Sequence, residues 1–225
     1  ALSSAASDVY KRQMLHKETV SPSTLELLTT LMKDCRLKHF VLVGGTSLSL
    51  QLGHRISVDL DLFSDLSFDE SELSSYLVEN YDLELDFISR STLKGEIRGV
   101  QIDCISHQYP WLSPCVEEDV IRLASPVDIA AMKLNAIAGN GTRIKDFIDL
   151  AYLSTLLSLG EMLEAYEHKY KANVIMPLKA LTYWEDINFD EPIRMLGSAP
   201  FKWKKIEKRL LQMQKYPQKR FDLFP

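Results

Sequence analysis

Two aspartates at alternate positions have the spacing in this sequence that most directly suggests chemistry. Asp59 and Asp61 lie in the run Val58-Asp59-Leu60-Asp61-Leu62-Phe63, which alternates between apolar and other residues with period two. On a strand, both carboxylates would leave the same face, about 7 Å apart along the chain. Carboxylates this close repel each other unless a cation neutralises them, and divalent cations such as Mg²⁺ take oxygen ligands. A solvated strand edge can have the same pattern, so the surrounding residues decide between a metal site and a solvated face.

A glycine pair favours a phosphate site near these acids. Gly44-Gly45 follows an apolar run over residues 39–43, which we interpret as a buried strand, and precedes a helical pattern over residues 46–52. Free N–H groups and the helix dipole bind anions at such a turn, and glycine allows a phosphate to approach the backbone closely. Side chains that could add donors for the phosphates of a nucleotide are Thr46, Ser47, Arg55 and Ser57.

A third acid lies on another predicted strand. Asp103 alternates with Val100, Ile102 and Ile105, which directs it away from the apolar face. If this strand pairs beside the first, Asp103 completes a three-carboxylate site that can hold two Mg²⁺ ions, and it can accept the proton of an attacking hydroxyl. Otherwise it is one more exposed strand acid.

A lysine and two acids later in the chain could belong to the same site. Lys133 is the one cation in the apolar helical stretch from Val127 to Ile137, where it needs an anionic partner unless it reaches the helix surface. Asp146 and Asp149 lie three residues apart on one helical face. They could hold Lys133 or Arg143 in position, or form an ordinary exposed turn.

These residues form four motifs that, in this order over residues 40–150, resemble the AbiEii/AbiGii abortive-infection toxin family of the DNA polymerase beta-type nucleotidyltransferase superfamily. The motifs are Gly44-Gly45-Thr46-x-Leu48 through Arg55-x-Ser57-x-Asp59-x-Asp61-Leu62, Ile102-Asp103-Cys104, the stretch from Asp128 to Ala136 with its single Lys133, and Lys145-Asp146-Phe147-Ile148-Asp149-Leu150. The resemblance covers about half of the chain.

The resemblance implies a Mg²⁺-dependent nucleotidyltransferase with an NTP as substrate. In this interpretation Asp59, Asp61 and Asp103 bind two metal ions, and Asp103 also acts as the base. Gly44, Gly45, Thr46, Ser47 and Ser57 hold the triphosphate, which Arg55 and Lys133 neutralise. The family further implies that Lys133 and an acid of the fourth motif are needed for activity, with Asp146 as the first choice and Asp149 as the second.

The resemblance also implies a biological setting. The chain would be the toxin of a type IV toxin-antitoxin or phage-defence system in the cytoplasm, encoded beside an antitoxin that opposes it without binding tightly. The acceptor would be RNA, at the acceptor end of tRNA. Two alternatives remain open: the acceptor is a hydroxyl of a small molecule or a protein, or the chain is a nucleotide-binding module without activity.

A basic segment near the end of the sequence is a candidate surface for docking RNA. Only Glu207 and Asp222 oppose its cations there, and Trp203 and Phe221 are interleaved with them. Its basic residues are Lys202, Lys204, Lys205, Lys208, Arg209, Lys215, Lys219 and Arg220. The alternative is the solvated face of a final helix.

The order of predicted strands and helices indicates an α+β fold. We expect a nucleotidyltransferase-type mixed sheet with flanking helices, followed by a C-terminal helical bundle. Strands are predicted at 58–63, 83–88, 92–97 and 100–105, with Gly95 and Gly99 at the turns. Helices are predicted over 21–32, 46–52, 67–80, 125–138, 145–159, 161–171, 177–184 and 201–216, the third opening on a capping box that starts at Ser67. We interpret 1–13 as an artefact or disordered tail, 14–108 as the nucleotidyltransferase core and 109–225 as a helical domain.

Composition excludes several classes of protein. The 225 residues include 26 basic and 31 acidic side chains, and a net charge of -5 argues against a protein that coats nucleic acid by charge alone. No apolar run approaches the roughly 18 residues that span a bilayer, and no signal peptide is expected. The three cysteines lack C-x-x-C spacing, so neither a disulfide framework nor a zinc site is expected.

Overall fold

The computed structural model describes residues 15–197 and 200–225, and its contacts divide the chain into two compact units. The first unit comprises the described residues up to Gly53, with Ser57–Gln108 and Pro114–Ala124. The second comprises His54–Ile56, Tyr109–Ser113 and Ser125–Pro225. Residues 1–13, interpreted above as an artefact or tail, lie outside the described residues, and the domain boundary after residue 108 stays a prediction.

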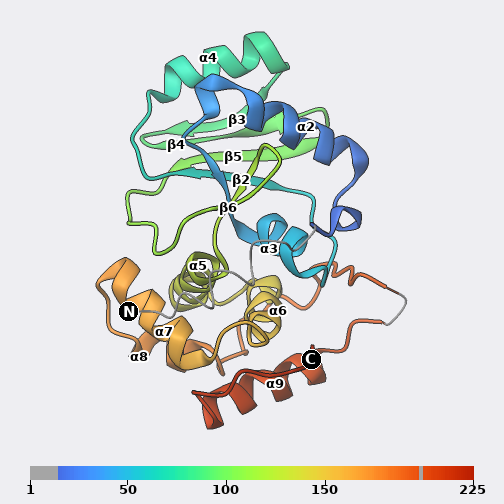
Figure 1. Cartoon of the computed structure of the whole chain (residues 1–225), viewed down its shortest axis with the longest axis vertical. Helices are drawn as coiled ribbons and strands as arrows, with labels where there is room; N and C mark the ends of the chain where they lie inside the picture. Colours follow the sequence, from blue (N-terminus) through green and yellow to red (C-terminus); the bar gives the residue numbers. More distant parts are fainter. Residues whose placement is uncertain (1–14, 198–199) are drawn as a thin grey trace. The chain divides into compact units, whose positions relative to one another are not determined.

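A seven-stranded mixed sheet forms the centre of the first unit (Figure 1). The strand order is β3-β4-β5-β2-β1-β7-β6. β2 runs parallel to β5, and β1 runs parallel to β7, whereas the other neighbouring pairs are antiparallel. The strands are β1 (Val41–Leu42), β2 (Leu60–Ser64), β3 (Glu84–Ser89), β4 (Thr92–Ile97), β5 (Val100–Ser106), β6 (Val116–Glu118) and β7 (Ile121–Leu123).

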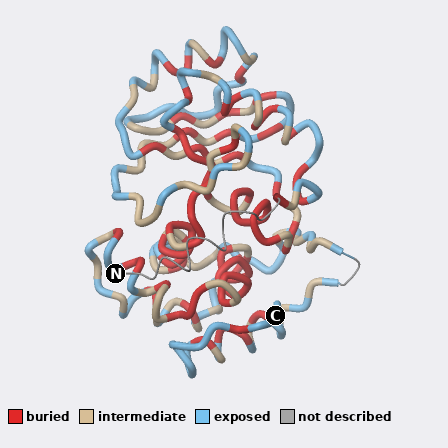
Figure 2. Tube along the Cα trace, viewed as in Figure 1, coloured by how far each residue is buried: buried red, intermediate tan, exposed pale blue. Residues whose placement is uncertain are grey.

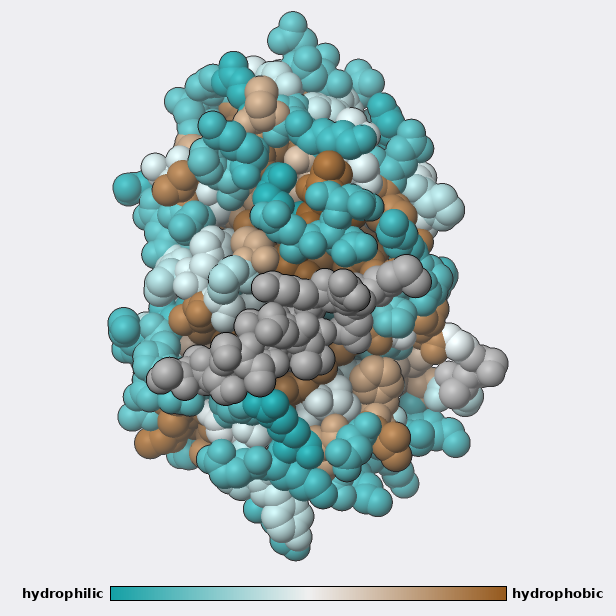
Figure 3. Space-filling view, in the orientation of Figure 1, coloured by the Kyte–Doolittle hydropathy of each residue, from teal (hydrophilic) through white to brown (hydrophobic). Residues whose placement is uncertain are grey.

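Three α-helices of the first unit begin and end at residues with the expected local chemistry. α2 (Pro22–Lys33) begins with Ser21 as N-cap, and α3 (Gly44–Leu52) ends at Gly53 in the left-handed conformation. α4 (Glu70–Tyr81) has Asp69 as its N-cap, two residues after the predicted Ser67. Short 3-10 helices occupy Lys17–Thr19 and Cys35–Leu37. The surface of α4 visible in Figure 3 is mostly hydrophilic.

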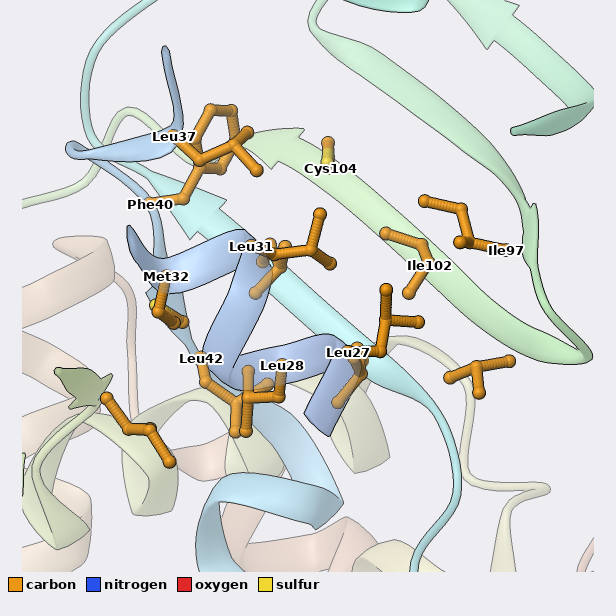
Figure 4. Close-up of a cluster of buried hydrophobic side chains, with 14 of the residues drawn as sticks. Leu27, Leu28, Leu31, Met32, Leu37, Phe40, Leu42, Ile97, Ile102 and Cys104 are labelled. Atoms are coloured by element: carbon orange, nitrogen blue, oxygen red, sulfur yellow. The ribbon is translucent and has the colours of Figure 1, made fainter. Parts of the chain in front are cut away.

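The core of the first unit lies between the sheet and the apolar faces of α2 and α4. Leu27, Leu28 and Leu31 of α2 belong to one buried cluster with Ile102 and Cys104 of β5, which Figure 4 shows facing the helix. Leu73 and Leu77 of α4 join the same cluster. One sheet face is therefore apolar and covered, which leaves alternate residues of β2, β4 and β5 on the opposite face.

The second unit is helical among its described residues. Its helices are α5 (Pro126–Gly139), α6 (Ile144–Leu153), α7 (Leu159–Tyr170), α8 (Ile175–Ala180) and α9 (Trp203–Lys215). α5 contacts α6, α7 and α8, and α6 also contacts α9. All ten residues of α6 except Lys145 are buried, so this helix forms the centre of the unit (Figure 2). None of the described helices combines the length and the apolar character needed to cross a bilayer.

The predicted α+β class with a mixed sheet, flanking helices and following helices is confirmed, but several details differ. β2 begins at Leu60, and Val58, expected on the apolar face, is 56% exposed. Gly95 lies inside β4 and not at a turn, and glycine fits there because a Cβ would collide with the Glu84 carbonyl oxygen. β6 and β7 form a hairpin where the sequence predicts no strand. Among the cysteines, Cys104 is buried and Cys35 is exposed.

Candidate active site

Two aspartates lie side by side on the sheet face opposite the apolar core. β2 pairs with β5 in parallel register, and Asp61 lies opposite Asp103. The flanking residues Leu60, Leu62 and Ile102 are at most 1% exposed in the core, so alternation places both carboxylates on the other face. From the sequence we expected the strand of Asp103 to pair beside the acidic strand with the carboxylates on one face. The register places Asp103 beside Asp61 in this way.

The glycine turn lies directly against this pair. Gly44 has φ +68°, a value that glycine adopts without strain, and begins α3. A Cβ built on Gly44 would come within 2.2 Å of Asp61 Oδ2. The N-terminus of α3, where the helix dipole favours negative charge, is therefore adjacent to the Asp61 carboxylate.

The hydroxyl groups near this turn contact the protein. Thr46 is 1% exposed, and its hydroxyl bonds to the Asp59 carbonyl oxygen and lies 2.9 Å from the hydroxyl of Ser57. The hydroxyl of Ser47, which is fully buried, accepts a hydrogen bond from Gln51. Thr46 thus fixes the segment that enters β2, a role that the spacing of hydroxyl residues did not reveal.

Of the three expected carboxylates, Asp61 and Asp103 lie opposite each other, and Asp59 lies two residues before Asp61 in the chain. Asp59 precedes β2 and is exposed. Among residues 15–197 and 200–225, no three His, Cys, Asp or Glu side chains are grouped closely enough to hold a metal ion. Two carboxylates on one sheet face offer the oxygen donors that suit a hard cation such as Mg²⁺. A three-carboxylate site with two metal ions stays a prediction.

A lysine that sequence reasoning missed completes this row of charges. Lys94 on β4 lies opposite Asp103 on β5, and its ammonium group forms an ion pair with Asp103 Oδ2. Gly44, Asp61, Asp103 and Lys94 thus follow one another across α3, β2, β5 and β4. Position 94 alternates with buried Leu93 and Gly95, which is the signal that could have identified it.

The second unit contains a separate, buried network of charges centred on Asp149. Arg55 binds this carboxylate through two hydrogen bonds, from Nε to Oδ1 at 2.7 Å and from Nη2 to Oδ2 at 2.9 Å. Lys133 Nζ lies 2.8 Å from Asp149 Oδ2 and 2.6 Å from Asp146 Oδ1. His54 Nε2 adds a hydrogen bond to Asp149 Oδ1 at 2.9 Å.

The charges of this network balance. Burial alone would raise the pKa of Asp149, but Arg55 and Lys133 outweigh it and hold that pKa well below its usual range. Burial would likewise lower the pKa of Lys133, but Asp146 and Asp149 raise it. His54 has a lowered pKa because it is buried, so it is neutral near pH 7. Two cations therefore face two anions, which is the arrangement that makes buried charges tolerable.

Comparisons with known proteins identify the family of the chain. The family model described as "Nucleotidyl transferase AbiEii toxin, Type IV TA system" matches residues 26–110 and 80–222. The chain belongs to the AbiEii family. An uncharacterised protein of Aquifex aeolicus (strain VF5), aq_aa25, is 33% identical over 154 residues, which cover 65% of this chain and 74% of that protein.

Solved structures share the fold of this AbiEii chain. A Helicobacter pylori protein described as a nucleotidyltransferase superposes with a TM-score of 0.55 at 17% identity, covering 88% of this chain and 96% of the other. JHP933, also from Helicobacter pylori, gives a TM-score of 0.50 at 17% identity over 88% and 93% of the two chains. At such identity the likeness concerns the fold, and the AbiEii family match makes the chain a nucleotidyltransferase.

The first residue of the third AbiEii-like motif, Asp128, forms a buried ion pair with α7 that sequence reasoning missed. Asp128 and Lys169 are both buried, and Lys169 Nζ lies 2.9 Å from Asp128 Oδ1. The N–H groups of Leu112 and Ser113 and the hydroxyl of Ser125 donate to the same carboxylate. Asp128 therefore ties the 109–113 segment to α5 and α7 within the second unit.

The basic segment of the AbiEii chain is divided by burial. Arg209 is buried and donates hydrogen bonds to the Ser154 hydroxyl and the Leu223 carbonyl. Trp203 stacks edge-on with Phe147, Trp184 and Phe189, and Phe221 is buried under Arg209. These aromatic rings are engaged within the unit. The outer face of α9 has a groove of about 390 Å³ lined by Lys204, Glu207, Lys208, Leu211, Gln212 and Lys215.

The contact between Gly44 and Asp61 predicts the cost of adding a side chain. Gly44→Ala places a methyl group against the carboxylate in a left-handed conformation, whereas Gly99, with φ +79°, has nothing within 4 Å of a built Cβ. Gly99→Ala should lose about 1 kcal/mol of unfolding free energy, and Gly44→Ala about 1–3 kcal/mol more. Urea unfolding followed by circular dichroism measures both. Equal losses would contradict the close approach of Gly44 to Asp61.

The buried state of His54 predicts a pH dependence of stability. Its pKa is lower in the folded protein than the roughly 6.5 of an unfolded histidine, so the unfolded chain binds the additional proton. Stability should therefore be complete above about pH 7 and decline towards pH 5. Asp149, whose pKa is also lowered, loses its contribution only below about pH 4.

A substitution separates this contribution from those of other groups. His54→Gln keeps an N–H donor for Asp149 but cannot titrate, so it should flatten the decline between pH 7 and 5. His168→Gln, at an exposed position of α7, is the matched control and should leave the slope as in the wild type. Thermal unfolding at several pH values measures the slope. If His168→Gln flattens the decline and His54→Gln does not, the assignment to His54 is wrong.

Proposed function

We propose that this AbiEii chain transfers a nucleoside monophosphate from an NTP to a hydroxyl group of RNA, in a reaction that requires Mg²⁺. The observation that carries the proposal is the placement of Asp61 and Asp103 side by side, with the N-terminus of α3 against Asp61. A nucleotidyltransferase needs a polyphosphate site next to its acids, and this arrangement supplies both within one unit.

In this proposal the residues of the first unit have three roles, which are binding the triphosphate, positioning the acidic segment and holding the metal. The Gly44-Gly45 turn binds the triphosphate through backbone N–H groups, and Thr46 holds the segment that carries Ser57 and Asp59 in place. Asp61 and Asp103, with Asp59 as the third acid, would hold Mg²⁺. The metal supplies charge neutralisation at the reacting phosphate.

The chemical step is an in-line displacement at the α-phosphate. The acceptor oxygen forms a bond to the α-phosphorus while the bond from that phosphorus to the β-phosphate bridging oxygen breaks, and pyrophosphate leaves. Asp103 accepts the proton of the acceptor hydroxyl. Orientation of the two oxygens and compensation of charge provide most of the rate enhancement in reactions of this type.

Arg55 and Lys133 enter this proposal as positioning residues and not as phosphate ligands. Arg55 is buried and bound in a bidentate manner by Asp149, and Lys133 binds both Asp146 and Asp149. Releasing either cation towards a phosphate would leave a buried carboxylate without compensation, which is costly. Asp149, which contacts Arg55, Lys133 and His54, is the centre of the network ahead of Asp146.

The family match supports the proposed biological role. The AbiEii chain acts as the toxin of a type IV system in the cytoplasm, and the tRNA acceptor end is its substrate. In this proposal an antitoxin opposes the toxin without forming a tight complex with it. We assign the outer face of α9 to RNA because Lys204, Lys208 and Lys215 line one groove there.

Labelled NTPs test the reaction and its acceptor. The wild-type protein, incubated with each α-labelled NTP, Mg²⁺ and total RNA, should label RNA of tRNA size. Asp61→Asn and Asp103→Asn should reduce labelling at least about 100-fold, because loss of a metal ligand exceeds the 10- to 100-fold effect of changing its surroundings. Both variants should keep their fold, since removing one of two like charges relieves repulsion.

The matched control is Asp86→Asn, which removes an exposed acid from β3 of the same unit and should retain activity. Label in protein or in a small molecule would exclude RNA as the acceptor. Absence of any label with all four NTPs would favour a binding module without activity. Wild-type labelling by Asp61→Asn would refute the assigned site.

Salt dependence tests the α9 surface. Each lysine that contacts a phosphate adds to the slope of log K against log salt, so Lys204→Gln with Lys208→Gln should lower that slope by roughly 1–2 units. The same number of charges is removed by Lys171→Gln with Lys179→Gln, exposed positions elsewhere in the unit. Binding of tRNA between 50 and 200 mM salt measures the slope, in about the range where such effects are large. Equal slopes for both double variants would exclude α9 as the docking surface.

A further inference from the structure

We propose that Lys94 is the resident counter-ion of the acidic pair and competes with the divalent metal for Asp103. This inference rests on the proposed function, because it concerns the same carboxylates. It assigns a role to a residue outside all four AbiEii-like motifs. The ion pair between Lys94 and Asp103, in register with Asp61, is the observation that carries it.

The position of Lys94 is set by the sheet and not by a flexible loop. β4 and β5 pair over six residues without a shift, and Lys94 lies opposite Asp103 in that ladder. The neighbours Leu93 and Gly95 are buried on the apolar face, so the lysine stem leaves the sheet on the side of the acids. The pairing therefore places the Lys94 side chain beside Asp103, within reach of its carboxylate.

The charge of Lys94 compensates a repulsion that the register creates. Asp61 and Asp103 face each other across one pair of neighbouring strands, and two like charges at this spacing destabilise the fold. One ammonium group at Asp103 removes part of that cost while no metal is bound. A divalent cation that uses the same carboxylate must displace the ammonium group or accept its repulsion.

The exposure of the lysine makes displacement feasible. The side chain of Lys94 is 42% exposed and that of Asp103 is 22% exposed, so the ion pair is partly hydrated already. The ammonium group can therefore return to water with little loss of free energy. This distinguishes Lys94 from Lys133, whose side chain is 7% exposed between two acids. Lys94 is thus a displaceable cation, and Lys133 is a fixed one.

Metal binding measured directly tests the inference. The probe is Mn²⁺, whose free form gives an electron paramagnetic resonance signal, titrated into the full chain without nucleotide. Lys94→Met keeps the apolar stem and removes the charge, and it should bind Mn²⁺ about 3- to 10-fold more tightly than the wild type. Lys94→Arg keeps the charge and should bind like the wild type.

A stability measurement separates competition from a loss of structure. Without metal, Lys94→Met should melt at a lower temperature than the wild type, because the acidic pair loses its counter-ion. Saturating Mn²⁺ should raise its melting temperature by more than it raises that of the wild type, since the tighter site gains more from binding. Arg98→Gln, which removes an exposed cation from the β4–β5 turn, should change neither quantity.

The outcomes distinguish this inference from the proposed function. If Asp61→Asn and Asp103→Asn weaken Mn²⁺ binding but Lys94→Met does not strengthen it, the competition is refuted and the metal site stands. If the two aspartate variants bind Mn²⁺ like the wild type, the pair holds no cation, and both proposals are wrong. Tightening by Arg98→Gln equal to that by Lys94→Met would show a general effect of charge and would also refute the specific role.

Discussion

The parallel register between β2 and β5 is the constraint on which the candidate site depends. It sets Asp61 opposite Asp103 while their neighbours Leu60 and Ile102 are buried on the other face. A shift of one residue on either strand would bury one carboxylate in the core, at a cost of several kcal/mol. Apolar burial by α2 and α4 therefore fixes the geometry of the charged face as firmly as it fixes the core.

The close approach of Gly44 follows from the same register. β1 lies beside β2, so the turn that leaves β1 begins α3 within reach of Asp61. Glycine is required there for two separate reasons, the left-handed φ and the absence of space for a Cβ. A position with two such requirements tolerates no other residue without a change in either the turn or the acid, which explains why glycine and aspartate occur together in the first motif.

Sequence alone could predict the elements whose signals are local. The capping serines of α2 and α5, the glycine after α3 and the alternation in β4 and β5 each identified an element close to its observed bounds. The hairpin of β6 and β7 was missed because each strand has three residues, too few for a period to emerge. Val58 was assigned to the wrong environment because period two cannot show where a strand starts.

The site was predictable as residue types but not as contacts. Asp61 and Asp103 could be expected to meet, because both alternate with buried residues on strands of one sheet. The partner of Arg55 could not, since it is a carboxylate 94 positions away on a helix. Alternation indicates the face on which Lys94 lies, but its ion pair with Asp103 depends on the register between β4 and β5. The sequence therefore led us to expect that the charged residues of the motifs bind the substrate. In the second unit, the cations of the motifs neutralise buried aspartates instead.

The buried network around Asp149 includes a short segment that precedes the acidic strand in the chain. His54–Ile56 belongs to the second unit, although the residues on both sides of it belong to the first. Within the second unit, Asp149 binds His54 and Arg55, and the backbone of this segment pairs with residues 194–196. Asp59 follows Ile56 by three residues, so a carboxylate on α6 restrains the chain just before the acidic strand. The charges of Arg55 and Asp149 are therefore used within the second unit, where they hold this short segment, and not to bind a substrate.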